Sequence, residues 1–457
     1  MRGDEASLLS PVDVAWLSMD HATNPMMITA LLRVEGLRAA DFRSFLQAYW
    51  LQWQRFRARP VMRGATWWWE TDPTFALDRH LEVVAPALPS PEALQTWVSE
   101  RLNEPLPNHH PRWKFWYVPL EGEAPAILLR IHHCYADGLS LVGVFRNLTT
   151  AAPEEHPDPA STGVHELRHQ WMQASWAWLQ RQVRLSSGEG SGGGGVGKGL
   201  ESWAETGLRF VNELTDYLLE EMDSPTPLRG ALTGRKQCCW SEPVPLERFK
   251  AIARSTGSKV NDVLLACVAY ALRQQLERAG QSLQDLILHA AVPVDLRAML
   301  PDSLQPDSGM LGNLFGTVFV PLPVDAETGL EQLFRIKHET RRLKHSWQPG
   351  ISWGLLCSAG LMPRQWQEPL TRLFSRKASA VVSNVPGSGE QRYLAGCPVR
   401  EQMFWVPQAG DIGLGVSIIS YAGQVQFGIK ADEGVLPDPL AFRDDCLAAL
   451  EPLERLL

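Results

Sequence analysis

The feature that most constrains this chain is the stretch Ile127–Leu141, which reads ILLRIHHCYADGLSL. Its opening residues are mostly apolar and have the length and branching of a buried strand, and a helix can begin at its end. Two histidines, an aspartate and a glycine lie between them, at positions His132, His133, Asp137 and Gly138. The chain therefore presents titratable groups where it leaves the core, and loops held by a rigid scaffold are where chemistry is usually found.

This pattern is identified as the HHxxxDG signature of acyltransferases that use coenzyme A or a carrier thioester. An alcohol is a poor nucleophile at neutral pH, so its proton must be removed as it attacks the thioester carbonyl. A neutral imidazole, with an unperturbed pKa of about 6.5, suits this step. Since successive side chains of an extended segment point to opposite faces, His132 and His133 cannot both enter one pocket. The resemblance assigns the base to His133 and a supporting role to His132.

The acid and the glycine of the signature are expected to shape the loop. The Asp137 carboxylate can brace the loop or hold an arginine across the site, while Gly138 permits a tight backbone. We predict that Arg297, in the segment VPVDLR, is this arginine.

Two other interpretations of the same loop are a cysteine nucleophile and a zinc site. Cys134 could act with a histidine, but a cysteine adjacent in sequence to His133 should point away from it. His132, His133 and Asp137 could bind zinc, yet adjacent histidines rarely converge on one ion, and the sequence has no HExxH. We therefore expect a site without a metal.

Composition argues against several classes of protein. At 457 residues, 45% of them hydrophobic, the chain can hold two or three domains with large cores. A net charge of −8 argues against a nucleic-acid partner, whose phosphates favour a basic face. The seven cysteines have no CxxC spacing and indicate reduced thiols in a cytoplasmic protein. The N-terminus carries Asp4 and Glu5 and does not resemble a signal peptide, and the longest apolar run, Val263–Leu272, is too short to span a bilayer.

Several further motifs resemble the bacterial wax ester synthase/diacylglycerol acyltransferase family, in the family's order. They are Leu-Ser-Pro-Val-Asp at 9–13, an Asn-Asp pair at 261–262 and Ser-Asn-Val-Pro-Gly at 383–387. The segment Pro111–Trp116 is similar to the family's Pro-Leu-Trp element, with Arg112 in place of the usual leucine, and it is expected to be structural and outside the chemistry. The resemblance extends from about Leu9 to Glu433.

Other candidate residues come from the second half of the chain. Asn261 and Asp262 stand at a predicted helix start, where they can cap free N–H groups, or Asn261 can help to orient substrate or steady the thioester oxyanion. Small residues in the segment Trp353–Met362 leave room for an alkyl chain. Ala359 and Gly360 are the candidates there, although both could equally be ordinary helix packing.

Periodicity predicts a helix at Asp41–Arg59 and another at Glu166–Leu185, each with tryptophans and arginines that could touch lipid. Trp67–Trp69 is expected in a strand, and a closing hairpin is expected to turn at Ala422-Gly423.

The glycine-rich segment 186–199 is interpreted as a linker. Its glycines match a dinucleotide fingerprint in letters, but no strand precedes them and no helix follows at once. We therefore predict an N-terminal acyltransferase domain over 1–185, a linker and crossover over 186–234, and a C-terminal acyltransferase-like domain over 235–457.

The resemblance implies a two-domain α/β fold with mixed sheets, like that of coenzyme A-dependent acyltransferases, with the active site at the domain interface. It implies an O-acyltransferase that moves a long-chain acyl group from acyl-CoA to a fatty alcohol, to diacylglycerol, or to both. His133 would act as general base in a direct attack on the thioester. Acyl-CoA is then a substrate, and no cofactor is expected.

The product of such a reaction is apolar, which suggests action at the inner membrane face or at a lipid-droplet surface. Two rival functions remain open. One is a condensation-type enzyme that takes its acyl group from a carrier protein, and the other is a non-catalytic lipid-binding protein on the same fold.

Overall fold

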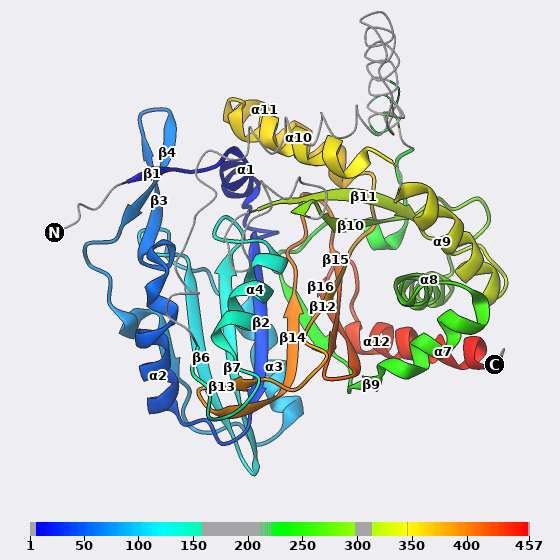
Figure 1. The fold of residues 1–457 in the computed structure, drawn as a ribbon. Helices are drawn as coiled ribbons and strands as arrows, with labels where there is room; N and C mark the ends of the chain where they lie inside the picture. Colours follow the sequence, from blue (N-terminus) through cyan, green and yellow to red (C-terminus); the bar gives the residue numbers. More distant parts are fainter. Residues whose placement is uncertain are drawn as a thin grey trace, which may run out of the picture.

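The computed structural model describes residues 6–157, 221–297, 313–344 and 346–455, together with 212, 215, 217 and 219. The chain forms two large mixed sheets that lie side by side, with helices around them (Figure 1). The predicted helix at Glu166–Leu185 and the glycine-rich linker at 186–199 lie outside the described residues.

The first large sheet has the strand order β13-β14-β2-β7-β6-β5. Its strands are β13 (Tyr393–Leu394), β14 (Cys397–Trp405), β2 (Met27–Val34), β7 (Glu123–His132), β6 (Trp113–Leu120) and β5 (Leu81–Val83). Helices α2 (Ala39–Ala48) and α4 (Gly138–Leu148) pack on one face, and α3 (Pro91–Leu102) packs on the other. The predicted strand before the histidines is therefore β7, at the centre of this sheet.

The second large sheet runs in the order β11-β10-β12-β15-β16-β8. Its strands are β11 (Phe315–Pro321), β10 (His289–Asp295), β12 (Ala380–Pro386), β15 (Leu414–Tyr421), β16 (Gln424–Asp432) and β8 (Lys236–Trp240), and the short β9 (Val244–Pro245) pairs with β16. Strands β10, β12 and β15 are parallel, while the other pairs are antiparallel.

One face of this second sheet is covered by helices that share a single apolar core with it. They are α7 (Leu246–Thr256), α8 (Val260–Arg278), α9 (Gly329–Leu343), α12 (Pro439–Ala448) and α13 (Leu450–Glu454). The predicted hairpin turn is confirmed, because Ala422 and Gly423 both have positive φ between β15 and β16.

The two sheets are joined by a strand that crosses between them. β14 comes from the second half of the chain but pairs with β2 in the first sheet. A third apolar cluster contains residues of both sheets, including Leu128, Val385 and Trp405. The fold is thus the expected two-domain α/β arrangement, but no single point in the chain separates the two sheets.

Three further helices lie over the edge of the second sheet. They are α1 (Pro11–Met19), α10 (Gln348–Leu361) and α11 (Arg364–Ser375). A small sheet of β1 (Ser7–Leu8), β4 (Thr66–Thr71) and β3 (Ala58–Arg63) projects beside α1 (Figure 1). The predicted strand at Trp67–Trp69 is therefore confirmed as part of β4.

The predicted helix over Asp41–Arg59 is correct only in its first half. Helix α2 ends at Ala48, and two 3-10 turns and strand β3 follow. Trp50, Trp53 and Phe56 are buried against one another and against the first sheet. Aromatic packing in the core therefore replaces the continuous helix, and these tryptophans do not reach lipid. No helix within the described residues is both long and apolar enough to cross a membrane.

The expectation that Gly360 lines an alkyl pocket is wrong. A Cβ at this position would lie 1.7 Å from the carbonyl oxygen of Pro11. The glycine instead allows α10 to pack closely on the start of α1, and it is not part of a cavity wall. Ala359, one position earlier, does line the cavity described below.

Candidate active site

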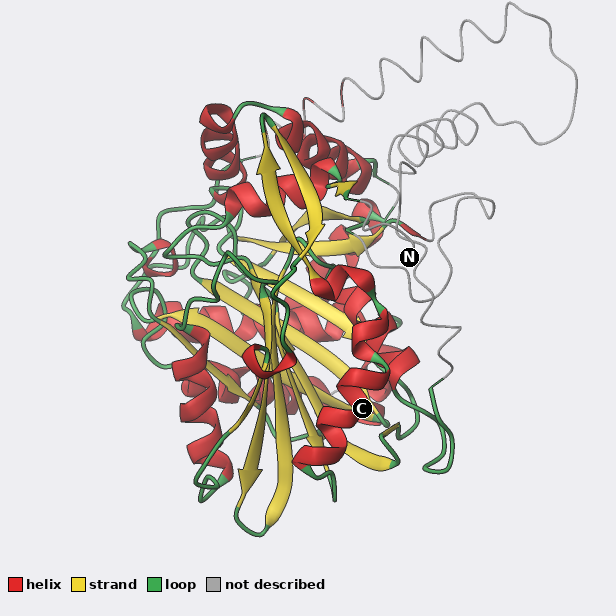
Figure 2. Cartoon of the chain, turned by 90° about the vertical axis from the view of Figure 1, so that its left-hand side faces the viewer, coloured by secondary structure: helices red, strands yellow, loops and turns green. Residues whose placement is uncertain are grey.

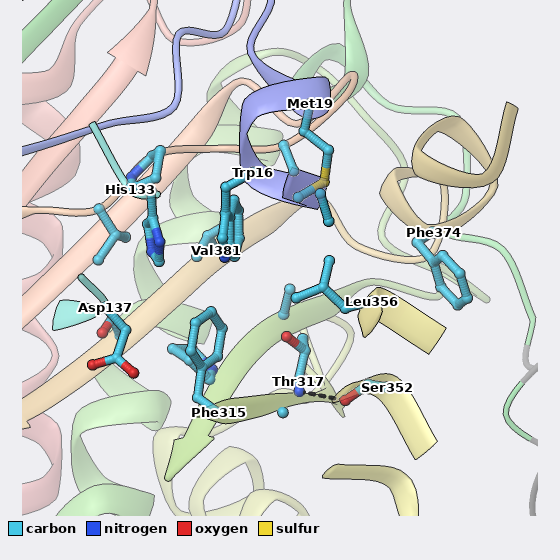
Figure 3. Close-up of a pocket in the computed structure, with 18 of the residues that line it drawn as sticks. Trp16, Met19, His133, Asp137, Phe315, Thr317, Ser352, Leu356, Phe374 and Val381 are labelled. Carbon is cyan, nitrogen blue, oxygen red and sulfur yellow. Dashed lines mark hydrogen bonds between the residues drawn. The ribbon is translucent and has the colours of Figure 1, made fainter. Parts of the chain in front are cut away.

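A mostly apolar cavity of about 230 Å³ lies between the second sheet and helices α1, α10 and α11 (Figure 3). His133 and Asp137 lie on one side of it and Phe374 on the other. Its wall includes Trp16, Met19, His133, Asp137, Gly138, Val294, Phe315, Thr317, Ser352, Leu356, Ala359, Thr371, Phe374, Val381, Asn384 and Ile412. The cavity thus combines mostly apolar walls with the imidazole and the carboxylate of the predicted signature.

His133 follows the last residue of β7 and is held from both halves of the chain. Its backbone N–H donates to the carbonyl of Met26 at 2.8 Å, and its own carbonyl accepts from Nδ2 of Asn313 at 3.0 Å. The imidazole stacks on Trp16, with 4.0 Å between ring centroids, and Phe315 lies beside it at 5.7 Å. Burial lowers the pKa of His133 to about 4, so the imidazole is neutral at physiological pH.

His132 points to the opposite side, as the alternation of an extended chain predicts. Its Nδ1 accepts a hydrogen bond from the N–H of Cys134 at 3.2 Å, so the proton of the neutral ring is on Nε2. That Nε2 lies 3.4 Å from the carboxylate of Asp20. Burial lowers the pKa of His132, and the nearby carboxylate opposes this effect. His132 therefore holds the turn after β7 and does not enter the cavity.

Arg112, which is expected to be structural and outside the chemistry, does not line the cavity but is linked to His132 through Asp20. Its guanidinium donates to Oδ2 of Asp20 at 2.6 Å, the same carboxylate that faces His132. Burial would raise the pKa of Asp20, but His132 and Arg112 lower it below its usual value. The carboxylate is thus ionised and connects Arg112 to the histidine beside the proposed base.

Asp137 receives three hydrogen bonds. Its Oδ1 accepts from the N–H of Ser140 at 2.6 Å and so caps helix α4. Its Oδ2 accepts from Arg297 at 2.8 Å and from the N–H of Leu314 at 2.9 Å. Burial would raise the pKa of Asp137, but these partners hold it below its usual value. The predicted contact with Arg297 is present, and it ties the loop to the second half of the chain.

Gly138 lines the cavity, but the expected reason for a glycine there is wrong. Its backbone is not in the left-handed region, and a Cβ would have no atom within 4 Å. The missing side chain therefore leaves open space beside His133 and Asp137.

The structure argues against both alternative interpretations of the loop. Cys134 is buried in the apolar core, outside the cavity wall, and burial raises the pKa of its thiol well above the usual value. His132, His133 and Asp137 do not form a metal-binding cluster, and no such cluster of three His, Cys, Asp or Glu occurs within the described residues.

Asn261 and Asp262 lie behind the cavity wall. Asp262 caps the start of α8, where its Oδ2 accepts from the N–H of Lys259 at 2.8 Å and its Oδ1 from Thr340 at 2.7 Å. Oδ1 of Asn261 accepts from Nδ2 of Asn384 at 3.2 Å. Only Asn384 lines the cavity itself.

Some residues around the base were not assigned by sequence reasoning. Asp13 is the last residue of the Leu-Ser-Pro-Val-Asp motif, and Trp16 follows it on α1, which is capped by Ser10. Nδ2 of Asn313 donates to Oδ1 of the buried Asp13 at 2.8 Å. The same Nδ2 donates to the carbonyl of His133. The motif itself was a signal for these residues, but only the fold shows that α1 lies over His133.

Comparison with known sequences decides the family. The description "Wax ester synthase/diacylglycerol acyltransferase catalytic domain" matches residues 9–264, and "WS/DGAT C-terminal domain" matches residues 311–454. This chain belongs to the wax ester synthase/diacylglycerol acyltransferase family. It is therefore an acyltransferase of a family that uses acyl-CoA.

A named relative and a solved structure support the assignment to this family. The "Probable diacyglycerol O-acyltransferase tgs1" of Mycobacterium tuberculosis H37Rv is 28% identical over 453 residues, which cover 94% of this chain and 92% of that protein. The solved wax ester synthase/diacylglycerol acyltransferase of Marinobacter aquaeolei VT8 has a TM-score of 0.68 at 21% identity, with 98% and 99% of the chains covered.

A more distant solved structure, the trichothecene 15-O-acetyltransferase of Fusarium sporotrichioides, has a TM-score of 0.60 at 12% identity. The comparison covers 98% of this chain and 95% of that one. This similarity shows that the two proteins share a fold.

We predict that the contact between Asp20 and His132 supports catalysis in this wax ester synthase/diacylglycerol acyltransferase family member. Asp20→Ala leaves the largely buried guanidinium of Arg112 unpaired and should cost about 1–3 kcal/mol of unfolding free energy. In the double variant Asp20→Ala/Arg112→Leu both charges are gone, so part of this stability should return, although the buried N–H of Met26 still lacks its acceptor, Oδ1 of Asp20. Its kcat should nevertheless stay about tenfold below wild type, because His132 still lacks its partner.

The measurements are chemical unfolding and steady-state acyl transfer. Asp41→Ala, which breaks the exposed Arg38–Asp41 ion pair, is the matched control and should change both quantities little. A double variant with recovered stability and wild-type kcat would show that the Asp20–His132 contact has no part in catalysis.

Proposed function

We propose that this protein transfers a long-chain acyl group from acyl-CoA to the hydroxyl group of a fatty alcohol or of diacylglycerol. The observation that carries this proposal is the position of His133, a buried and neutral imidazole in the wall of a mostly apolar cavity. An apolar cavity suits an alkyl chain, and a neutral imidazole suits removal of a hydroxyl proton. Family membership supports both substrate classes.

In the proposed reaction His133 takes the hydroxyl proton as the acceptor oxygen attacks the thioester carbon. A carbon–oxygen bond forms, and the tetrahedral intermediate collapses as the carbon–sulfur bond breaks. The proton held by His133 passes to the departing sulfur, so the products are an ester and free coenzyme A. The step needs no acyl-enzyme, because the acceptor attacks the thioester directly.

Two further groups are assigned roles in this proposal. Asp137 is saturated by Ser140, Leu314 and Arg297, so it positions the loop and takes no proton. Asn384 lies near the carboxyl end of β12 and donates one amide hydrogen to Asn261. We assign its amide, oriented by Asn261, to stabilise the thioester oxyanion. This assignment replaces the expected direct role of Asn261.

The role of His133 is tested by release of coenzyme A from palmitoyl-CoA, with hexadecanol or diacylglycerol as acceptor. Wild type should release thiol only when an acceptor is present. His133→Gln should lower kcat by at least about 10²-fold, because the general base is lost. The exposed His338, in α9, supplies the matched control His338→Gln, which should behave as wild type.

Equal rates in wild type and His133→Gln would contradict the assignment of the base. Folded wild type that releases no thiol with either acceptor, but transfers an acyl group from a carrier protein, would favour the condensation-type alternative. The ratio of rates with the two acceptors identifies the product class.

The lowered pKa of His133 predicts an unusual pH profile. Since the neutral imidazole is the active form and persists down to pH about 4, kcat/KM should stay constant below the ordinary histidine pKa of about 6.5 and fall only as pH approaches 4. Trp16→Ala exposes the imidazole to water and should move this acid limb upward, toward 6.5. Rates are measured across the range where circular dichroism shows both proteins folded. A wild-type acid limb near 6.5 would contradict a buried base.

A further inference from the structure

Helices α10 and α11, which line the cavity, also form an outer surface of the molecule. Their inner faces contribute Leu356, Ala359 and Phe374 to the cavity wall. Helices α10 and α11 are joined by a short turn at Met362-Pro363 and lie at the upper end of the molecule in Figure 1. Together with α1, this hairpin therefore separates the apolar cavity from the surroundings.

The tip of the hairpin exposes large apolar side chains. Leu361 is 67% exposed, Met362 is 40% exposed and Trp366 is 61% exposed. We call these three residues the hairpin tip. The hairpin of β3 and β4 projects at the same end of the molecule, and its Met62 is 54% exposed (Figures 1 and 2). Apolar groups gathered at one end mark an interaction site more often than isolated ones do.

The charges around the hairpin tip differ from those of the whole chain. Residues 346–363 contain no Asp, Glu, Lys or Arg. Residues 364–376 contain three arginines and one glutamate, a net charge of +2, whereas the chain as a whole carries −8. An uncharged apolar tip followed by a basic segment matches the boundary of an anionic phospholipid layer, where apolar groups enter the acyl region and arginines meet the headgroups.

We propose that the hairpin tip docks into the surface of an anionic phospholipid layer, so that the acceptor lipid enters the cavity from that layer. The route of the acceptor rests on the proposed function, while the docking does not. Trp366 suits such a position, since tryptophan combines an apolar body with a polar N–H group and favours membrane interfaces. The opposite faces of the same two helices then contact the lipid layer and the substrate cavity.

The test uses the full chain and sedimentation with vesicles of phosphatidylcholine, with or without phosphatidylglycerol. Wild type should bind the anionic vesicles more tightly than the neutral ones. Leu361→Ser/Trp366→Ser should weaken binding to anionic vesicles by about tenfold or more, because two large apolar groups no longer enter the layer. Leu440→Ser, at a 47% exposed leucine in α12, is the matched control and should bind as wild type.

Acyl transfer by the same proteins separates docking from chemistry. With a short water-soluble alcohol, Leu361→Ser/Trp366→Ser should match wild type, whereas turnover of diacylglycerol held in anionic vesicles should fall in parallel with binding. A protein that binds vesicles as predicted but transfers no acyl group would refute the proposed function and leave the docking intact. Wild-type binding by the double variant, or a change of oligomeric state without loss of vesicle binding, would overturn the docking proposal.

Discussion

The site depends on one buried carboxylate. Asp137 caps helix α4 through Ser140 and binds Arg297 and the N–H of Leu314 from the other half of the chain. A buried charge is tolerated only when its partners replace the water it has lost, and here they come from two distant segments. The loop that carries His133 can therefore take its shape only after both halves have docked, which couples formation of the site to assembly of the whole fold.

The two adjacent histidines have different roles because successive side chains of a strand point to opposite faces. His133 faces the cavity and is kept neutral by burial under Trp16. His132 faces the other way, toward Asp20, and fixes the backbone of the turn. The neighbouring Arg112 donates to the same carboxylate, and His132 and Arg112 together hold the pKa of Asp20 below its usual value.

Local patterns predicted the features that depend on local sequence, such as the strand before His133 and the turn at Ala422-Gly423. The fold and family also followed from the order of the motifs. Local sequence could not decide between alternative roles where distant neighbours determine them. Gly360 meets Pro11 across a helix contact, and Asn261 reaches the cavity only through Asn384. The spacing of residues in the sequence does not show which distant side chains meet in the folded chain. These roles could therefore be assigned only from the fold.

The proposed function requires that the acyl chain of the donor lies in the cavity beside His133. The most direct measurement is a crystal structure with a non-reactive thioether analogue of palmitoyl-CoA. We expect the alkyl chain to lie between β11 and helix α10, with the carbon that stands for the thioester carbonyl near the imidazole of His133, so that a hydroxyl group fits between them within about 3–3.5 Å of the carbon. An analogue whose chain lies outside this cavity, or whose reactive carbon lies far from His133, would contradict the proposed function.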